Sequence, residues 1–261
     1  MLRALWTAAT GMTAEQENID IIAHNMANVN TTAYKKMRPT FHDLIYQTIV
    51  QPGAPTSDTT QNPTGLQIGL GTAITGTYGI FTQGNLIKTD RQLDVAIEGD
   101  GFFKVILPDG TEAYTRDGNF RLDKDGRIVT ADGYPLSPQI VVPPNAVQIS
   151  IGKTGRVVAI LQDNTTVDLG QITLTKFINP AGLKRIGDNL YLWSDAAGNP
   201  IEGNPGTEGL GILRQGYLEA SNVDIVEEMV NLITAQRAYE FNSKAIKAGD
   251  AMLQTAANLR P

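Results

Sequence analysis

Apolar residues near the start of the chain recur at alternating intervals of four and three residues, which is the spacing along one face of an α-helix. The series consists of Leu5, Ala9, Met12, Gln16, Ile19, Ala23 and Met26, with Gln16 as its interruption. After Met26 the chain is rich in Asn and Thr, whose side chains compete for backbone hydrogen bonds and end helices. We therefore predict a long helix that stops near residues 28–30. A secretory signal is not predicted, because no small-x-small cleavage site follows the apolar stretch.

A second series of this kind runs through the C-terminal region. Ile225, Leu232, Tyr239, Ile246 and Leu253 recur every seven residues, with Met229 and Gln236 at the complementary positions. No proline interrupts residues 222–258, so one helix can run through them. Two such seams predict that the terminal helices pack on each other, on copies of themselves, or both, as in a coiled coil. The alternative is that they cover one face of a central sheet.

Residues 51–87 contain a single charged residue, Asp58, together with seven Gly, three Pro and eight Thr. Leu66, Ile68 and Leu70 alternate with other residues, as they would in a half-buried strand. Two interpretations stay open for this segment. It is either an extended arm or hairpin that buries its apolar residues against neighbouring molecules, or an irregular edge of a β domain.

From Leu93 to about Leu218 the pattern is that of short strands separated by turns. Asp–Gly pairs, which favour tight hairpin turns, fall at 100/101, 109/110, 117/118, 125/126 and 132/133. The short apolar runs between them predict an all-β region built from hairpins.

The predicted fold class is therefore α+β: long N- and C-terminal helices paired as a coiled-coil-like domain, a central all-β hairpin-rich domain and an extended low-charge segment. The predicted boundaries are residues 1–36 and 220–261 for the two helices of one composite helical domain. Residues 37–92 form the extended arm and linker, and residues 93–219 form the β domain.

Composition narrows the possible chemistry. The chain of 261 residues has 21 Lys and Arg against 27 Asp and Glu, a net charge of −6, with two His and no Cys. The absence of Cys excludes disulfides, thiol nucleophiles and Cys-containing zinc sites. The acidic balance argues against generic binding to nucleic acid or to an anionic membrane, and no apolar stretch is long enough to span one.

Short motifs of chemical interest fail on inspection. Asp123, Asp125 and Gly126 resemble part of a calcium-binding loop, but the first and twelfth ligand positions are wrong and a hairpin turn explains them better. His24 and His42 stand without a nucleophile motif and are interpreted as packing or surface residues. We predict no catalytic, cofactor-binding or metal-binding residue, and hence no enzyme and no cofactor.

Four segments together resemble the bacterial flagellar rod and hook family. They are Asn25-Met-Ala-Asn28-Val-Asn30-Thr31-Thr32-Ala-Tyr-Lys35, Val95-Ala-Ile-Glu-Gly-Asp-Gly-Phe-Phe103, Tyr114-Thr-Arg-Asp-Gly-Asn-Phe120, and Ser221-Asn-Val-Asp-Ile-Val-Glu-Glu-Met229 followed by Gln236-Arg237-Ala-Tyr239-Glu. The resemblance spans nearly the whole chain. It departs from the family at Ala33, which stands where the family usually has Gly. If this position needs a positive φ, Ala costs about 1–2 kcal/mol there.

The resemblance implies a structural role in bacterial motility. It implies export by the flagellar type III apparatus and self-assembly into a hollow helical tube of the periplasm-spanning basal body, with the helices inside and the β domain outside. The implied partners are further copies of the chain, proximal rod proteins, the hook protein or hook junction, and the rings at the peptidoglycan and the outer membrane. The alternatives are another axial subunit of the same family or, in a different class, an envelope enzyme that cleaves glycans.

The predicted subunit contacts follow from the two seams and from the Asn-rich segment after the first helix. They are Leu5, Met12, Ile19, Met26, Asn25, Asn28, Asn30, Ile225, Met229, Leu232, Tyr239, Ile246 and Leu253.

Overall fold

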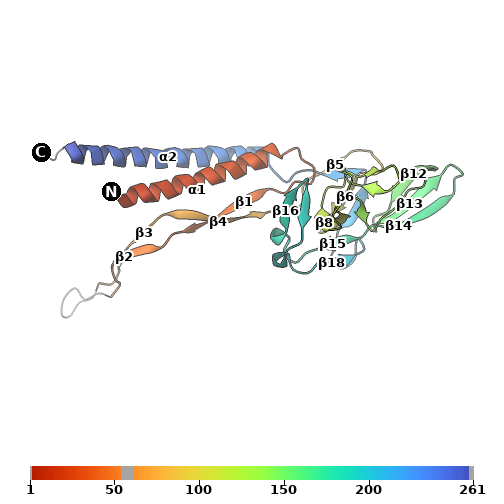
Figure 1. Cartoon of the computed structure of the whole chain (residues 1–261), viewed down its shortest axis with the longest axis horizontal. Coiled ribbons are helices and arrows are strands. Elements are labelled where there is room, and N and C mark those ends of the chain that lie inside the picture. Colours follow the sequence, from red (N-terminus) through yellow and green to blue (C-terminus); the bar gives the residue numbers. More distant parts are fainter. Residues whose placement is uncertain (1, 54–61, 259–261) are drawn as a thin grey trace. The chain divides into compact units, whose positions relative to one another are not determined.

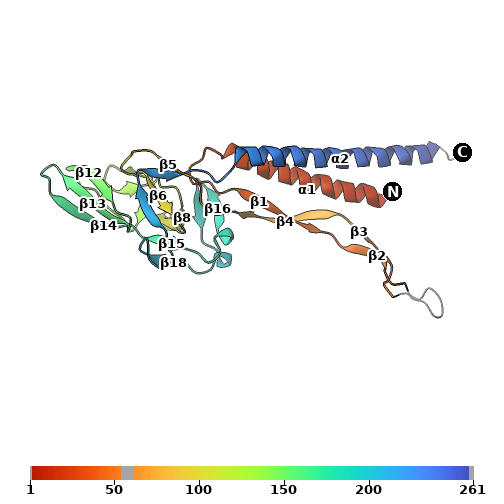
Figure 2. The ribbon, with the colours of Figure 1, turned by 180° about the vertical axis from the view of Figure 1, so that it is seen from behind.

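The computed structural model describes residues 2–53 and 62–258, and the chain divides into two compact units. The helical unit comprises residues up to 26, residues 37–78 and residues from 224 onward, and the β unit comprises residues 27–36 and 79–223. Figures 1 and 2 show the elements of both units from opposite sides.

The helical unit is built on two long helices, α1 (Leu2–Ala27) and α2 (Ile225–Asn258). They lie side by side and antiparallel (Figure 1). Their register is fixed by small residues: a Cβ on Gly11 would lie 2.8 Å from Nδ2 of Asn242, and one on Gly249 would lie 2.6 Å from Cδ2 of Leu5. The two helix backbones approach closely at these points because glycine has no side chain there.

The prediction of a coiled-coil-like domain is wrong. Knobs-into-holes packing requires large apolar residues along the contact. The face of α2 that meets α1 is interrupted by Glu228, Asn242 and Gly249, which are separated by fourteen and seven residues. Two members of the predicted seam, Ile225 and Met229, are each 48% exposed. The contact between the helices therefore combines small and polar residues with partly buried apolar ones such as Leu232 and Ile246, within a fold that is α+β overall.

The rest of the helical unit is a pair of two-stranded ribbons. Its strands are β1 (Met37–Asp43), β2 (Tyr46–Val50), β3 (Leu66–Gly69) and β4 (Thr72–Gly79). β1 pairs with β4, and β2 pairs with β3. These strands pair with each other, whereas residues 79–87 of the low-charge segment 51–87 belong to the β unit. Residues 54–61 of that segment lie outside the described residues.

The β unit contains sixteen strands and two short 3₁₀ helices. The strands are β5 (Leu86–Lys88), β6 (Val95–Glu98), β7 (Phe102–Ile106), β8 (Glu112–Thr115), β9 (Arg121–Leu122), β10 (Ile128–Val129), β11 (Leu136–Ser137), β12 (Ala146–Ile151), β13 (Arg156–Leu161), β14 (Thr166–Gln171), β15 (Leu174–Lys176), β16 (Lys184–Gly187), β17 (Leu190–Leu192), β18 (Ile201–Gly203), β19 (Ile212–Gln215) and β20 (Tyr217–Glu219). The 3₁₀ helices are η1 (Pro180–Gly182) and η2 (Asp195–Ala197).

The largest sheet has the strand order β16-β17-β8-β7-β15-β18, and β11 also pairs with β7. The β unit also contains a three-stranded antiparallel meander, β12-β13-β14. Three two-stranded pairs complete it: β6 with β19, β5 with β20 and β9 with β10. Hairpins at Asp109–Gly110 and Asp125–Gly126 confirm two of the predicted turns. The pair at 100/101 makes no hairpin, because β6 and β7 on either side of it belong to different sheets.

Alternating side chains of the large sheet form two separate cores, as the two faces of a pleated strand dictate. Phe103 and Val105 of β7 belong to an extensive apolar cluster shared with the meander. Phe102, which directly precedes Phe103 in β7, points to the other face, where it packs edge-on against Phe177 and Tyr191. The sheet is therefore buried on both sides over its central strands.

Candidate functional site

The segment between α1 and β1 is folded into the β unit. We call residues 28–36 the docked turn. The backbone N–H of Ala33 donates to the carbonyl of Glu219 at 2.8 Å, and the hydroxyl of Thr32 donates to Oδ2 of Asp117 at 3.1 Å. Asn222 accepts from the N–H of Lys36 at 2.7 Å through Oδ1. Three segments that are far apart in the sequence thus meet around this turn.

A buried charge cluster lies at the centre of this contact. The ammonium of Lys35 pairs with Oε1 of Glu219, and Nε of Arg116 lies 2.9 Å from Oε2 of the same carboxylate. The side chains of Lys35 and Glu219 are fully buried, and that of Arg116 is nearly so. The ammonium also donates to the carbonyl of Thr82 at 2.8 Å, and the N–H of Gly84 donates to Oε1 of Glu219 at 2.9 Å. One carboxylate therefore serves two cations.

The ionisation of the charge cluster is perturbed in both directions. Burial and the neighbouring Arg116 lower the pKa of Lys35 to about 8, against the attraction of Glu219. Burial acts to raise the pKa of Glu219, but the charges of Arg116 and Lys35 outweigh it and hold that pKa below its ordinary value. The carboxylate is thus the group that compensates both buried cations.

Ala33 occupies a left-handed backbone conformation, with φ of +56°, and is 2% exposed. This is the position at which the chain departs from the resembled family, which usually has Gly there. The docked turn keeps the conformation that glycine favours, and Ala bears the steric cost of its Cβ.

At the end of α1, Asn25 connects three segments of the helical unit. Its Nδ2 donates to the carbonyl of Met37 at 2.8 Å and to Oε2 of Glu228 at 3.3 Å, and its Oδ1 accepts from the N–H of Met37 at 2.9 Å. Both Asn25 and Glu228 are buried. A single amide side chain therefore joins α1, the start of β1 and the first turn of α2.

The opposite face of α2 exposes several apolar side chains to solvent. Val226, Val230, Ile233 and Phe241 recur at intervals that place them on one face of a helix with 100° per residue, turned away from Glu228 and Asn242. All four are exposed, Val226 to 72%. We call these four residues, with Met229 and Met252, the outer stripe of α2. Exposed apolar patches of this kind mark association surfaces.

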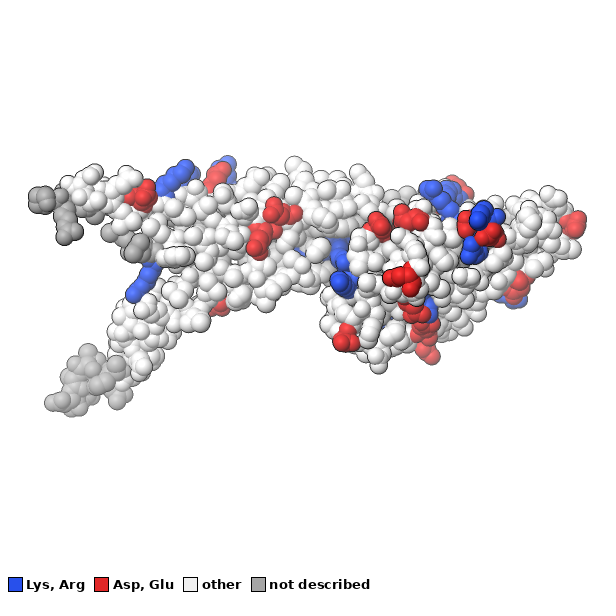
Figure 3. Space-filling model, in the orientation of Figure 1, with Lys and Arg blue, Asp and Glu red and all other residues white. Residues whose placement is uncertain are grey.

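The ribbons of the helical unit expose apolar side chains as well. We call these two ribbons, formed by β1 to β4, the arm. β2, β3 and β4 contain no charged residue, and the described part of the arm is almost wholly white in Figure 3. Over the β unit, acidic and basic side chains intermingle on this face. The exposed apolar residues of the arm are Phe41, Ile45, Tyr46, Ile49, Leu66, Ile68, Leu70 and Tyr78, with Ile45 at 81%.

The predicted contact residues fall into different environments. Leu5, Met12, Ile19, Met26 and Asn28 are partly buried, Asn25 is buried and Asn30 is exposed. On α2, Ile225 and Met229 are exposed, whereas Leu232, Tyr239, Ile246 and Leu253 are partly buried on the face shared with Glu228 and Asn242. The structure therefore separates the predicted set into an inward group and an outward group.

Two parts of the site were missed by the sequence analysis. The charge cluster was overlooked although Lys35 and Arg116 lie inside the segments that carry the family resemblance. In the sequence, Glu219 is simply an acidic residue that follows an apolar residue at the end of a short predicted strand. No local pattern identifies Lys35 and Arg116 as its partners. The outer stripe was overlooked because α2 has apolar residues on more than one face.

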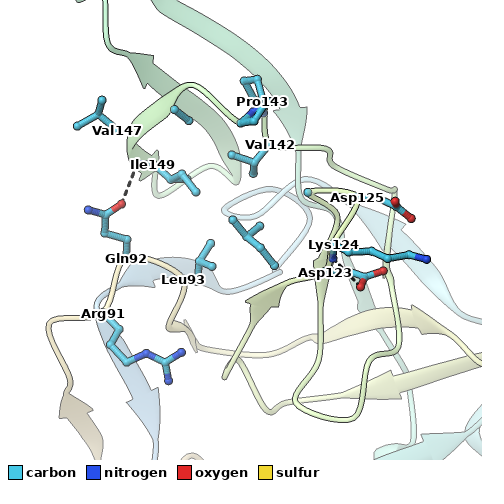
Figure 4. Close-up of a pocket in the computed structure, with 14 residues that line it drawn as sticks. Arg91, Gln92, Leu93, Asp123, Lys124, Asp125, Val142, Pro143, Val147 and Ile149 are labelled. Carbon is cyan, nitrogen blue, oxygen red and sulfur yellow. Dashed lines mark hydrogen bonds between the residues drawn. The ribbon is translucent and has the colours of Figure 1, made fainter.

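The β unit also contains a cavity of about 700 Å³ beside the β9–β10 hairpin (Figure 4). Gln92 accepts from the N–H of Ile149 at 3.0 Å on one side of it. On the other side Asp123 and Asp125 both pair with Arg127. The two carboxylates therefore share one guanidinium. Among residues 2–53 and 62–258 no group of His, Asp and Glu could hold a metal ion.

In the described part of the chain, neither helix is long and apolar enough to cross a membrane. Exposed apolar side chains on α2 and on the ribbons are typical of a protein that associates with other protein chains.

Comparison with known proteins gives the family. Three protein-family models match the chain: "Flagella basal body rod protein" over residues 5–35, "Flagellar hook protein FlgE/F/G D1 domain" over residues 96–159 and "Flagellar basal body rod FlgEFG protein C-terminal" over residues 214–259. The flagellar basal-body rod protein FlgG of Borreliella burgdorferi is 54% identical over 100% of this chain and 99% of its own length.

Two further relatives carry the same name. FlgG of Buchnera aphidicola subsp. Schizaphis graminum is 49% identical over 99% of this chain and 100% of its own length, and FlgG of Bacillus subtilis is 42% identical over 100% of both. The chain therefore belongs to the family of flagellar basal-body rod proteins. It is a structural subunit of the flagellar basal body, and within the family it is most like the distal rod protein.

Proposed function

We propose that the chain polymerises into the tubular distal rod by burying the outer stripe of α2 and the apolar arm against neighbouring copies. The polymer acts as the drive shaft that transmits torque for motility. The observation that supports this proposal most directly is the outer stripe, a set of exposed apolar side chains on a helix whose other face is already used by α1.

Burial of the outer stripe would contribute favourable energy to assembly. Complete burial of a large apolar side chain contributes about 1.5–3 kcal/mol. The six residues of the stripe are each about half exposed or more, so their burial at a subunit contact contributes about 5–9 kcal/mol before the costs of association.

The helical unit also contains a groove that could bind a side chain of a neighbouring copy. A groove of about 930 Å³ is lined by the first two turns of α1, by Ile68 and Gly69 of β3 and by Asn242 of α2. Its walls are mainly small residues, which leave room for large side chains. An apolar side chain of a neighbour's outer stripe fits the chemistry of this groove.

The partners above and below the polymer follow from family membership. We propose that proximal rod proteins and the hook or its junction contact the two ends of the tube, and that the surrounding rings contact the β unit. The charged surface of the β unit suits a contact that must slide, because its acidic and basic side chains are paired with each other. We propose no enzymatic activity for this subunit.

Electron microscopy and sedimentation of the concentrated full-length chain test this proposal. Ile233→Glu places a charge in the outer stripe and should prevent formation of tubes, whereas Asn231→Glu adds the same charge at an exposed polar position two residues away and should not. Helical circular dichroism should be equal in both variants, because neither residue faces α1. Tubes formed by Ile233→Glu, or a wild-type chain that stays monomeric, would contradict the proposal.

The arm is tested in the same way. Ile45→Asp charges its most exposed apolar residue, and Gln47→Asp is the matched control on β2. The first variant should assemble only at higher protein concentration, and the control should assemble like the wild type. Equal critical concentrations for both variants would remove the arm from the proposed interface.

A further inference from the structure

The β unit contains a second cavity. Its volume is about 500 Å³, within the range of small-molecule sites. The lining residues are Thr111, Glu112, Tyr114, Leu192, Trp193, Asn199 and Pro200. They come from the start of β8, the end of β17 and the loop after η2, so the cavity is built on the large sheet.

One wall of this cavity is an indole. Trp193 is 45% exposed, although tryptophan is usually more buried. Its Nε1 donates to the carbonyl of Gly198 at 2.8 Å, which satisfies the polar edge of the ring and restrains its orientation. The register of β17 with β8 pairs Leu192 with Ala113, so Trp193 stands one step further along, beside Glu112. The apolar ring is thus next to a carboxylate.

The other wall is polar and held in place. Oε2 of Glu112 accepts from the hydroxyl of Tyr114 at 3.4 Å, and its Oε1 lies 3.3 Å from Nζ of Lys104. Lys104 is fixed in turn by Glu202 at 2.6 Å. A carboxylate with two anchored oxygens still has lone pairs for further donors. The exposed side chains of Thr111 and Asn199 add a hydroxyl and an amide.

We propose that this cavity binds one pyranose unit of a neutral glycan. A pyranose ring has an apolar face of C–H groups that stacks on an indole, and an edge of hydroxyls that need acceptors and donors at fixed positions. Trp193 supplies the stacking surface, Glu112 accepts from hydroxyls, and Asn199 can both donate and accept. The single ionised lining group is a carboxylate, which disfavours an anionic saccharide.

A fluorescence titration tests this binding on the full-length chain. The protein has two tryptophans, so the Trp6→Phe variant leaves Trp193 as the only indole. The probes are chitotriose and cellotriose, which share β-1,4-linked pyranoses and differ in the N-acetyl groups. We expect a saturable change in the emission of Trp193 with a Kd of about 1 mM for at least one of them. No saturable change with either trisaccharide overturns the proposal.

Variants locate the binding. Asn199→Ala removes one amide from an exposed loop and should weaken binding about three- to tenfold, the loss expected for one hydrogen bond. Ile178→Ala is the control, because Ile178 is exposed in the same unit but does not line the cavity. Calorimetry on Trp193→Phe should show weaker binding still, with the unfolding midpoint checked separately. Unchanged affinity in both cavity variants would overturn the proposal.

A co-sedimentation experiment distinguishes two sources of such a glycan. Pelleting of the chain with purified peptidoglycan, released by chitotriose, identifies the wall polymer as the source. Binding of a free trisaccharide without pelleting identifies a soluble glycan, and both results support the site. A response to a proline-rich peptide but to neither sugar would assign the cavity to a protein partner and overturn the proposal.

Discussion

The charge cluster of the β unit predicts an unequal response to removal of its members. Glu219→Gln leaves Lys35 and Arg116 as two buried cations without a counter-ion, whereas Lys35→Met leaves a balanced pair of Glu219 and Arg116. Removing one partner of a buried ion pair costs about 3–5 kcal/mol, because an uncompensated charge is left behind. A volume-matched apolar replacement of the surplus cation costs about 0–2 kcal/mol, since its burial was itself unfavourable. We therefore expect Glu219→Gln to be more destabilising by about 2 kcal/mol or more.

Urea unfolding measures this difference. In the Trp6→Phe background the emission of Trp193 reports the β unit alone, and the midpoint multiplied by the slope gives the free energy of unfolding. The double variant Lys35→Met with Glu219→Gln should be less destabilised than the sum of the single variants, because it no longer contains two opposed cations. Strict additivity, or a milder effect of Glu219→Gln than of Lys35→Met, would refute the electrostatic reasoning.

Three further predictions concern the docked turn, its ionisation and the helix pair. Ala33→Gly should stabilise the β unit by about 0.5–1 kcal/mol, because φ is +56° at this position. A lower urea midpoint for this variant would contradict the prediction. The control Ala113→Gly, in a buried strand, should destabilise the β unit. The pKa of Glu219 is lowered in the folded chain, so its stabilisation is present above the unfolded pKa and should be lost as pH falls through the folded pKa. The unfolding free energy measured below about pH 4.5 should therefore drop more steeply in the wild type than in Glu219→Gln, and parallel curves would count against the assignment. Gly249→Val should destabilise the helix pair by an overpacking cost of about 1–3 kcal/mol and so lower the thermal midpoint measured by helical circular dichroism. Ala248→Val, on the exposed face, should leave the midpoint unchanged. Equal midpoints for the two variants would exclude the close helix contact.

Local patterns along the chain were sufficient to predict the helices, the strands and several turns. Periodic apolar spacing found α1 and α2 because a helix repeats its faces within a few residues, whatever it packs against. The hairpin at Asp125–Gly126 was predictable for a similar reason, since its geometry depends on two adjacent residues. The family resemblance was also visible in the sequence, because it is carried by contiguous segments.

The inward face of α2 was not predictable in this way. Leu232 and Met229 both belong to apolar stripes of the same helix, and periodicity alone does not say which stripe meets α1. Gly11 of α1 and Gly249 of α2 decide the matter, because the two backbones can approach closely only where side chains are absent. The stripe left outside is then free for association.

The sequence by itself determined the two long helices, the β-rich middle and the family, because these depend on residues that are neighbours along the chain. Only the tertiary structure brought Lys35, Arg116 and Glu219 together, over separations of 81 and 103 residues along the chain. The physical reason is that the balance of a buried charge depends on which distant groups share its low-dielectric surroundings, and no local pattern of residues records that choice.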